Sequence, residues 1–314
     1  MEHGDFFEAH AQLLRDAWAE LGLQDERLRR FHDDFVCPGL AEGVAETRAA
    51  VATGALGDDP EEAVRAWWSE VAPGVWSAPL LRPAIVASLR AEIERAAGAG
   101  IPTRRPNGMN RFGVILDSEV DGAVSYLGEL VAGLVRELLQ PIGRMLFPAN
   151  VGLGDDEEWF AFTVYYRSKS EVAEKVVEGG GEGRSRDGRD VALAEHRDAS
   201  VVTLNLNLNA PGEGFGGSSL TFIDERNASV KHEVKFEAGH AIIHLGSLRH
   251  SAQPIESGER QNLIVWLFGR DGDVRVASYA DDEQMGITER WGRRSPPEET
   301  CTLDAQLTTH TRDQ

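Results

Sequence analysis

Two residues in the second half of the chain could hold a metal ion. His196 and Asp198 stand two positions apart, directly before a stretch whose alternation predicts a β-strand. Residues two apart on an extended strand point to the same side, so an imidazole and a carboxylate there can bind one ion. A bare His-x-Asp pair is common by chance, so the site needs a second histidine from a distant strand.

Three downstream histidines could complete this site: His240, His244 and His250. Context favours His250, because Arg260 follows it and the planar guanidinium of an arginine can bind a carboxylate through two hydrogen bonds. Two histidines and one carboxylate on one face of an octahedron are typical of non-haem Fe(II) oxygenases. His240 and His244 are expected to be core or outward-facing residues. The favoured context also contains Pro254, Gly258 and Trp266.

Short strands in the second half would position these residues. From Val201 to Asn209 apolar and polar residues alternate strictly, which indicates a strand with two unlike faces. An aromatic and β-branched run at Trp159–Tyr166 predicts another strand. Glycine-rich turns separate such segments, and this spacing favours a β-sandwich or jelly-roll barrel. Further strands are expected at Ser219–Ile223, Ser229–Phe236, Ala241–Leu245 and Gln261–Phe268.

The first half predicts mainly helices that could cover a face of this sheet. Apolar residues recur at helical spacing from Val124 to Leu139, and Pro141 is expected to kink or end that helix. Proline just inside a helix start is favourable, so further helices are expected at Asp59-Pro60 and at Pro83. The sequence therefore predicts an α+β protein.

Composition divides the chain into three regions. We expect a mainly helical region at 1–150, a catalytic β-rich core at 151–270 and a polar tail at 271–314. Within the core, residues 168–190 are rich in Gly, Glu and Arg and predict a flexible loop. This loop is either a lid that orders over a substrate or an idle insertion.

The charge of the chain narrows the choice of partners. Among 314 residues, 52 acidic side chains outnumber 32 basic ones, for a formal net charge of −20. This balance argues against nucleic acid and membrane surfaces as partners, and favours a basic substrate or simply a solvated acidic surface. Cys37 and Cys301 alone provide no disulfide framework. Without a signal-like start or a membrane-length apolar run, we expect a soluble cytoplasmic protein.

The segments that carry the candidate ligands resemble a known enzyme family. His196–Asn209 and Phe215–Phe222 look like the catalytic domain of procollagen lysyl hydroxylases. His250–Trp266 is similar to the wider prolyl and lysyl hydroxylase superfamily, and the resemblance extends over Trp159–Gly269. It implies a double-stranded β-helix (jelly-roll) core that uses Fe(II), 2-oxoglutarate and O2, with ascorbate as an expected stimulant.

The resemblance also implies roles for individual residues. His196, Asp198 and His250 would bind iron, and Arg260 would bind the far carboxylate of 2-oxoglutarate. An arginine at this place resembles the lysyl hydroxylases more than the collagen prolyl 4-hydroxylases, which have lysine. Collagen itself is a poor substrate hypothesis, since neither glycosyltransferase domains nor a secretory context is visible.

Two further residues could contact 2-oxoglutarate. Tyr166 ends the strand before the first ligand, where related enzymes place a tyrosine hydroxyl, but it could equally be a core tyrosine. Tyr165 takes this role if the register shifts by one. Asn205 has a counterpart in the lysyl hydroxylases, and its amide would touch 2-oxoglutarate or cap a buried polar group.

A segment before the core could line the substrate side of the iron. Asn107, Asn110 and Arg111 lie in a turn followed by a strand-like run. Related hydroxylases often use the strand before the core in this way. A loop that only packs on the barrel is the alternative.

The sequence thus predicts an Fe(II)- and 2-oxoglutarate-dependent dioxygenase that hydroxylates an unactivated C–H bond and releases succinate and CO2. A peptidyl lysine or proline, or another amino-acid-like group, is the expected substrate. Alternatives are a free amino acid or natural product, a Zn(II) hydrolase with the same ligands, and a non-catalytic metal-binding barrel. Arg260 argues against a hydrolase, which needs no dicarboxylate clamp.

Overall fold

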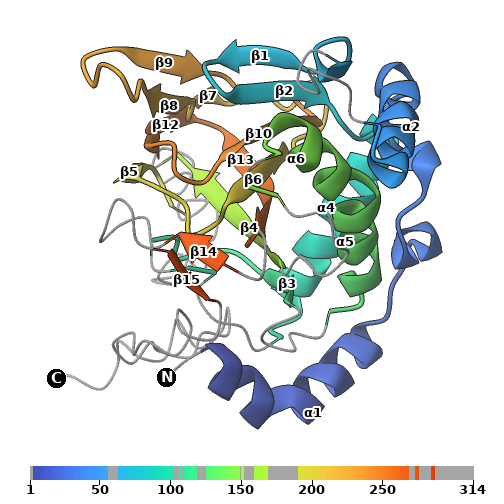
Figure 1. Cartoon of the computed structure of the whole chain (residues 1–314). Helices are drawn as coiled ribbons and strands as arrows, with labels where there is room; N and C mark the ends of the chain where they lie inside the picture. The colour runs from blue at the N-terminus through green and yellow to red at the C-terminus, as the bar shows by residue number, and fades with distance from the viewer. Residues whose placement is uncertain are drawn as a thin grey trace, which may run out of the picture.

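The computed structural model describes residues 3–55, 63–101, 106–107, 109–118, 125–148, 150–151, 159–168, 190–268, 273–275 and 284–286 (Figure 1). Its α-helices are α1 (His3–Leu21), α2 (Pro38–Thr53), α4 (Pro83–Gly98), α5 (Gly128–Leu134) and α6 (Gln140–Leu146). Two 3-10 turns, η1 (Glu26–Arg29) and η2 (Asp33–Phe35), and the π-helical turn η3 (Val135–Leu139) accompany them. The strands are β1 (Ser69–Ala72), β2 (Val75–Pro79), β3 (Ile115–Ser118), β4 (Trp159–Arg167), β5 (Leu193–His196), β6 (Val202–Asn207), β7 (Gly216–Gly217), β8 (Leu220–Ile223), β9 (Lys231–Val234), β10 (His240–Leu245), β11 (His250–Ala252), β12 (Ile255–Ser257), β13 (Glu259–Leu267), β14 (Asp273–Arg275) and β15 (Gln284–Gly286).

Two antiparallel sheets form the core. The larger has seven strands in the order β1-β2-β10-β6-β13-β4-β3, and the smaller has four in the order β5-β11-β8-β9. Side chains from the two sheets meet, since the ring of His244 on β10 lies 5.0 Å from that of Phe222 on β8. The predicted α+β class and double-stranded β-helix core are confirmed.

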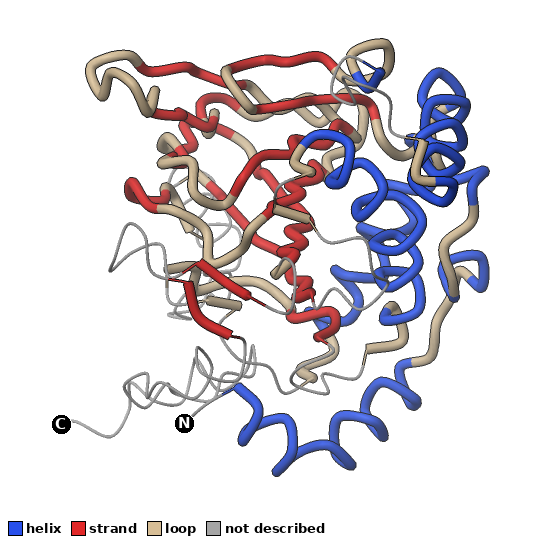
Figure 2. Tube along the Cα trace, in the orientation of Figure 1, coloured by secondary structure: helices blue, strands red, loops and turns tan. Residues whose placement is uncertain are grey.

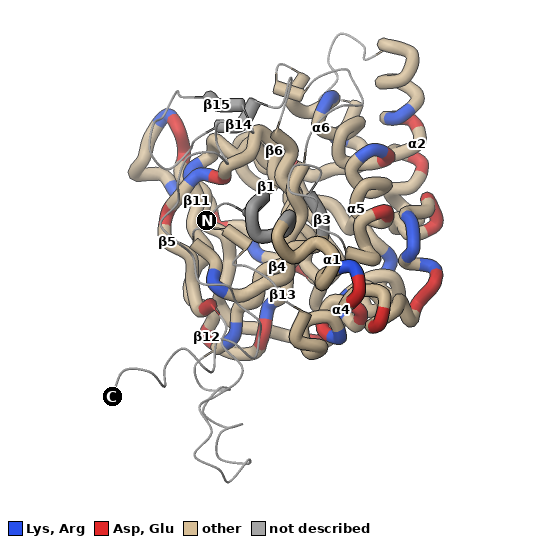
Figure 3. Tube along the Cα trace, turned by 90° about the horizontal axis from the view of Figure 1, so that it is seen from below, with Lys and Arg blue, Asp and Glu red and all other residues tan. Residues whose placement is uncertain are grey.

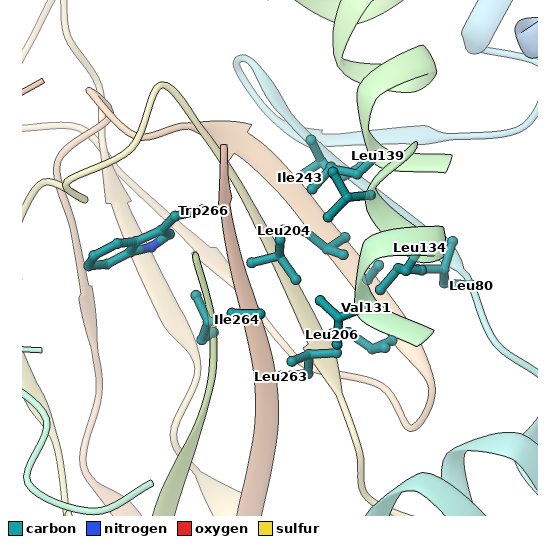
Figure 4. Close-up of a cluster of buried hydrophobic side chains, with 14 of the residues drawn as sticks. Leu80, Val131, Leu134, Leu139, Leu204, Leu206, Ile243, Leu263, Ile264 and Trp266 are labelled. Atoms are coloured by element: carbon teal, nitrogen blue, oxygen red, sulfur yellow. The ribbon is translucent and has the colours of Figure 1, made fainter. Parts of the chain in front are cut away.

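Helices cover the outer face of the larger sheet (Figures 1 and 2). Alternation along a strand sends successive side chains to opposite faces, so β6 turns Leu204 and Leu206 toward the helices. Figure 4 shows both facing Val131 and Leu134 of α5. All four are buried, and each contributes roughly 1.5–3 kcal/mol through the hydrophobic effect. Trp266 of β13 lies on the opposite face of the sheet (Figure 4).

The predicted helix before Pro141 does not end there. It starts at Gly128 within the described residues and continues to Leu146 through a π-helical turn. In that turn the N–H of Gln140 bonds the carbonyl of Val135, five residues earlier. The widened turn makes room for the proline ring, and Pro141 then occupies the first turn of α6, where its missing N–H costs nothing.

The first half also supplies three strands, two of which the helical prediction missed. β1 and β2 pair with each other, and β2 continues the larger sheet by pairing with β10. In β2, Val75 and Trp76 are both buried. This strand is covered on both faces and therefore lacks the alternation that identifies β6. β3 coincides with the strand-like run before the long helix.

Several sequence predictions lie outside the described residues. They are the helix start at Asp59-Pro60, the loop at 169–189 and most of the tail at 271–314, of which only β14 and β15 are described. Acidic and basic residues are interspersed along the outer helices (Figure 3). None of the helices in the described part of the chain combines the length and apolarity that a membrane crossing requires.

Candidate metal centre

The three predicted ligands converge although they are far apart in sequence. His196 ends β5, His250 begins β11, and the two residues are paired in the antiparallel ladder. The Oδ1 atom of Asp198 lies 3.4 Å from Nε2 of His196 and 3.8 Å from Nε2 of His250. One potential ligand atom from each residue falls within 4.8 Å of the others. This spacing suits donors that share one ion.

Backbone carbonyls orient both imidazole rings. Nδ1 of His196 lies 2.8 Å from the carbonyl oxygen of Ala194, and Nδ1 of His250 lies 2.9 Å from that of Leu248. A carbonyl only accepts hydrogen bonds, so each Nδ1 carries the proton in the neutral ring. The lone pair of each Nε2 therefore points toward Asp198, as a metal site requires.

A hydrogen bond to its second oxygen holds the carboxylate of Asp198 in place. Its Oδ2 accepts a 2.6 Å hydrogen bond from the hydroxyl of Thr203, which in turn lies 2.7 Å from Oγ of Ser200. The backbone N–H of Asp198 donates to the carbonyl of Gly246 at 2.9 Å. Oδ1 is thus left to face the two imidazoles.

The pKa values of the three ligands reflect their burial and their mutual contacts. Burial disfavours the charged form of Asp198, but the neighbouring imidazoles of His250 and His196 outweigh it and lower the pKa of the carboxyl. Burial lowers the pKa of His250 to about 3. For His196, burial is outweighed by its contact with Asp198, which raises the pKa of the imidazole. Of the two imidazoles in the metal-free site, His196 is therefore protonated more readily than His250.

The other two candidate histidines do not belong to the metal cluster, although His244 lies beside it. His240 is half-buried and faces Glu237, with Nε2 3.3 Å from Oε2. His244 is completely buried, and its Nε2 lies 3.9 Å from Oδ2 of Asp198 without a hydrogen-bond partner among the described residues. Within the described part of the chain, the cluster suited to a metal consists of His196, Asp198 and His250 alone.

Arg260 is buried on β13 and is 2% exposed. Its Nε donates a 2.9 Å hydrogen bond to Oγ of Ser218, and its guanidinium lies 4.2 Å from the ring centroid of Tyr166 and 4.4 Å from that of Phe236. Burial lowers the pKa of Arg260 to about 10, so the group remains charged at neutral pH. No carboxylate among the described residues forms an ion pair with it.

Tyr166, and not Tyr165, lies beside Arg260. Tyr166 pairs with Arg260 in the β4–β13 ladder, so the two side chains share a face of the sheet. The adjacent Tyr165 hydroxyl instead accepts a 2.8 Å hydrogen bond from Gln261. Nδ2 of Asn110 donates to the Tyr166 hydroxyl at 3.1 Å, which joins the segment before β3 to the residues around Arg260.

Asn205 belongs to a row of buried amides on β6 and β13. Its Oδ1 accepts a 2.5 Å hydrogen bond from Nδ2 of Asn262, whose Oδ1 accepts from Asn207 at 3.2 Å. Asn205 therefore partners a buried polar group, one of the two roles predicted for it. Asn107 and Arg111 lie in the segment before β3. The side chain of Asn107 donates a hydrogen bond to Asn110, and the backbone N–H of Arg111 donates one to Asp190.

Three residues at the site carried no predicted role. Thr203 lies on the polar face of β6, the same face as Asn205. The alternation of polar and apolar residues along this strand could have identified it. Ser218 lies in the glycine-rich turn before β8. Phe236 comes from the segment after β9, and nothing in its local sequence indicates that it meets Arg260.

The donor set fits an iron ion. Two neutral imidazoles and one carboxylate form the ligand set of non-haem Fe(II) oxygenases, which keep further positions open. Backbone carbonyls orient both imidazole rings, and a hydroxyl anchors the carboxylate. Hydrogen bonds of this kind hold metal ligands in their binding geometry.

Comparisons with known proteins agree with this geometry, and the chain belongs to the superfamily of 2-oxoglutarate- and iron-dependent oxygenases. Within it, a family model described as the OGFOD2-like domain matches residues 25–152. The 2-oxoglutarate and iron-dependent oxygenase domain-containing protein 2 of Xenopus tropicalis is 28% identical over 242 residues, covering 73% of this chain and 61% of that protein. The domain-containing protein ICU11 of Arabidopsis thaliana is 31% identical, covering 68% and 50%. The chain thus spans roughly half of the length of these curated relatives.

Solved structures with related folds include a Pseudomonas putida prolyl-4-hydroxylase. It is 18% identical, with a TM-score of 0.40, and the match covers 62% of this chain and 86% of that one.

Proposed function

We propose that this chain is the catalytic domain of an Fe(II)- and 2-oxoglutarate-dependent hydroxylase. Its reaction would convert an unactivated C–H bond of an amino-acid-like group to an alcohol, with succinate and CO2 as coproducts. Iron, 2-oxoglutarate and O2 together supply the oxidising chemistry, and the protein provides the binding, the orientation and a dry site.

The buried charge of Arg260 supports the binding of 2-oxoglutarate in addition to the binding of a metal. A buried cation is costly unless it is paired, and the described residues offer Arg260 hydrogen bonds and aromatic rings but no carboxylate. An anionic ligand would complete this environment. A dicarboxylate could place one end on the metal centre and the other on Arg260, which is the binding mode that 2-oxoglutarate needs.

The pocket residues would have distinct tasks. His196, Asp198 and His250 would bind Fe(II), and Arg260 would pair with the far carboxylate of 2-oxoglutarate. Tyr166 would offer its hydroxyl beside that carboxylate. Asn205 would contribute its amide from the adjacent strand, in addition to accepting from Asn262.

The resemblance to lysyl hydroxylases supports a peptidyl lysine or proline as the substrate, and the acidic composition of the chain is compatible with a basic one. The same chemistry on a free amino acid or a natural product is the second candidate. A mass-spectrometric screen of peptides and small amines for the gain of one oxygen atom separates the two.

The first test is conversion of 2-oxoglutarate to succinate by purified protein with Fe(II) and ascorbate. A slow uncoupled rate is expected without substrate. His196→Ala should abolish turnover, whereas Arg260→Ala should mainly raise the required 2-oxoglutarate concentration and leave metal binding intact. If the wild-type protein with Fe(II) failed to bind 2-oxoglutarate anaerobically, the proposal would be refuted in favour of a hydrolase or a non-catalytic module.

A further inference from the structure

Ser218 adopts a backbone conformation that serines normally avoid. Its φ is 55°, and it is the only non-glycine residue with positive φ in the described part of the chain. Its side chain is also completely buried. The left-handed region is unfavourable for a residue with a Cβ atom, and such strain persists only where the surroundings enforce it.

The surroundings of Ser218 fix this conformation. Its backbone N–H donates a 3.0 Å hydrogen bond to the carbonyl of Pro254. The preceding Gly217 also has a positive φ, and a Cβ atom there would approach the same carbonyl to 2.3 Å. A glycine would adopt the backbone conformation of position 218 without strain, so whatever distinguishes serine from glycine here comes from its side chain.

That contribution is a hydrogen-bond acceptor inside the pocket. Oγ of Ser218 lies 2.9 Å from Nε of Arg260 and occupies that donor. The rings of Tyr166 and Phe236 lie against the same guanidinium. Ser218 engages Nε, and the Tyr166 hydroxyl is a further hydrogen-bond partner of Arg260. The remaining N–H groups of the guanidinium are available to an incoming carboxylate.

We propose that Ser218 is a positioning residue that orients Arg260 to bind the far carboxylate of a dicarboxylate ligand. The inference rests on the proposed function, because it assigns to Arg260 the far end of 2-oxoglutarate. It predicts that Ser218 matters for ligands that reach Arg260 and does not matter for ligands that bind the metal alone.

Two probes separate these cases. N-oxalylglycine has the two ends of 2-oxoglutarate, whereas oxalate has only the metal-binding end. Each is titrated anaerobically into the Mn(II)-loaded protein by calorimetry, and the affinity for Mn(II) is measured in parallel. Activity is not required for any of these readouts.

Two substitutions separate the hydroxyl from the backbone. Ser218→Ala removes the hydroxyl and keeps the strain, whereas Ser218→Gly removes both. We expect both variants to bind N-oxalylglycine at least about tenfold more weakly, since a hydrogen bond to a charged group is lost. Oxalate and Mn(II) should bind as in the wild type. The glycine variant should melt at a higher temperature than the alanine variant, because glycine accepts positive φ.

Thr221→Val is the matched control. Oγ1 of Thr221 on β8 accepts a hydrogen bond of the same 2.9 Å length, but from Gln253. This variant should keep the wild-type affinity for N-oxalylglycine. Wild-type affinity in Ser218→Gly would overturn the inference, because the position would then matter only for its backbone. Equal losses for oxalate and N-oxalylglycine would also overturn it. Failure of the wild-type protein to bind either ligand would instead refute the proposed function itself.

Discussion

The hydroxyl of Thr203 donates a 2.6 Å hydrogen bond to Oδ2 of Asp198 and thereby turns Oδ1 toward the two histidines. Thr203 is five residues from Asp198 and lies on β6, a central strand of the larger sheet. The position of the carboxylate is therefore coupled to a fully buried strand at the centre of the sheet.

Thr203→Val should weaken metal binding. Valine keeps the shape of the side chain but cannot donate to Asp198, and loss of a partner that orients a ligand typically costs about 10–100-fold in metal affinity. Calorimetric titration with Mn(II) measures the change. Thr221→Val, which removes a hydroxyl from β8 outside the site, should bind Mn(II) normally. Unchanged affinity in Thr203→Val would show that the hydrogen bond does not orient the ligand.

Metal affinity should rise with pH across the neutral range. The metal needs the lone pair of His196, whose pKa in the metal-free protein is raised above its ordinary value of 6.5. Below the raised pKa, a proton competes with the metal and the affinity falls by about tenfold per pH unit; above it the affinity is constant. His250, with a pKa of about 3, does not compete in this range.

Mn(II) titrations between pH 6 and pH 8 test this dependence. His240→Gln should leave the profile unchanged, because that histidine contacts Glu237 and lies outside the metal cluster. An affinity that is independent of pH over this interval would contradict the assignment of the proton to His196.

Gly246→Ala should disturb the loop that carries Asp198. A Cβ atom at Gly246 would approach the carbonyl oxygen of Ser200 to 2.0 Å, while the Gly246 carbonyl accepts from the N–H of Asp198. The two backbone segments must separate, at a cost of roughly 1–3 kcal/mol in unfolding free energy. We expect weaker Mn(II) binding and a lower melting temperature.

Gly39→Ala in α2 is the matched control, because a Cβ atom there meets no atom within 4 Å. Its stability should equal or slightly exceed that of the wild type. Normal Mn(II) affinity in Gly246→Ala would mean that Asp198 does not depend on this close approach.

Glu92→Gln should destabilise the attachment of α1 and the segment after it to α4. Glu92 is 3% exposed; its Oε1 accepts hydrogen bonds from the backbone N–H groups of Gln24 and Asp25, and its Oε2 accepts one from the Tyr126 hydroxyl. Because Arg95 is also its partner, replacement by a neutral amide should cost roughly 2–4 kcal/mol at pH 7.

The deficit of Glu92→Gln should shrink in acid. Burial opposes ionisation of Glu92, but the hydrogen bonds from Arg95 and the backbone outweigh it and lower its pKa below the ordinary 4.5. Its stabilisation is therefore complete above pH 4.5 and is lost as the pH falls through the lowered pKa. Urea denaturation at pH 7 and at pH 3 measures this. The exposed Glu94→Gln should change stability by less than about 0.5 kcal/mol at both. An equal deficit for Glu92→Gln at pH 7 and pH 3 would argue against a charge-dependent role.

Local patterns were enough to predict the long central strands beside the candidate ligands, but not the short strands β5 and β11 that carry His196 and His250. The alternation at Val201–Asn209 appears as β6, and the aromatic run at Trp159–Tyr166 appears as β4. The two-residue spacing of His196 and Asp198 places both side chains in one cluster, and His250 joins them from β11. These features follow from the two-residue repeat of an extended strand, which can be recognised in a short stretch of sequence.

Helical periodicity was informative about the helices but not about where they stop. Pro141 would be expected to end an ordinary α-helix, but here a π-helical turn precedes it and the helix continues to Leu146. That turn is stabilised by packing of α5 and α6 on the sheet. The local sequence does not indicate whether such tertiary packing outweighs the energetic cost of a proline within a helix.

The sequence by itself predicted that His196, Asp198 and His250 cluster on a jelly roll, with Arg260 as their partner in binding a dicarboxylate. Residue type and strand spacing indicated His196 and Asp198, and the resemblance to a known enzyme family supplied the rest. Only the tertiary structure decided what orients them. Thr203 reaches Asp198, Ser218 reaches Arg260 across 42 positions of sequence, and Phe236 covers the same guanidinium. Such contacts arise from how strands distant in sequence pack together, and no local period records that arrangement.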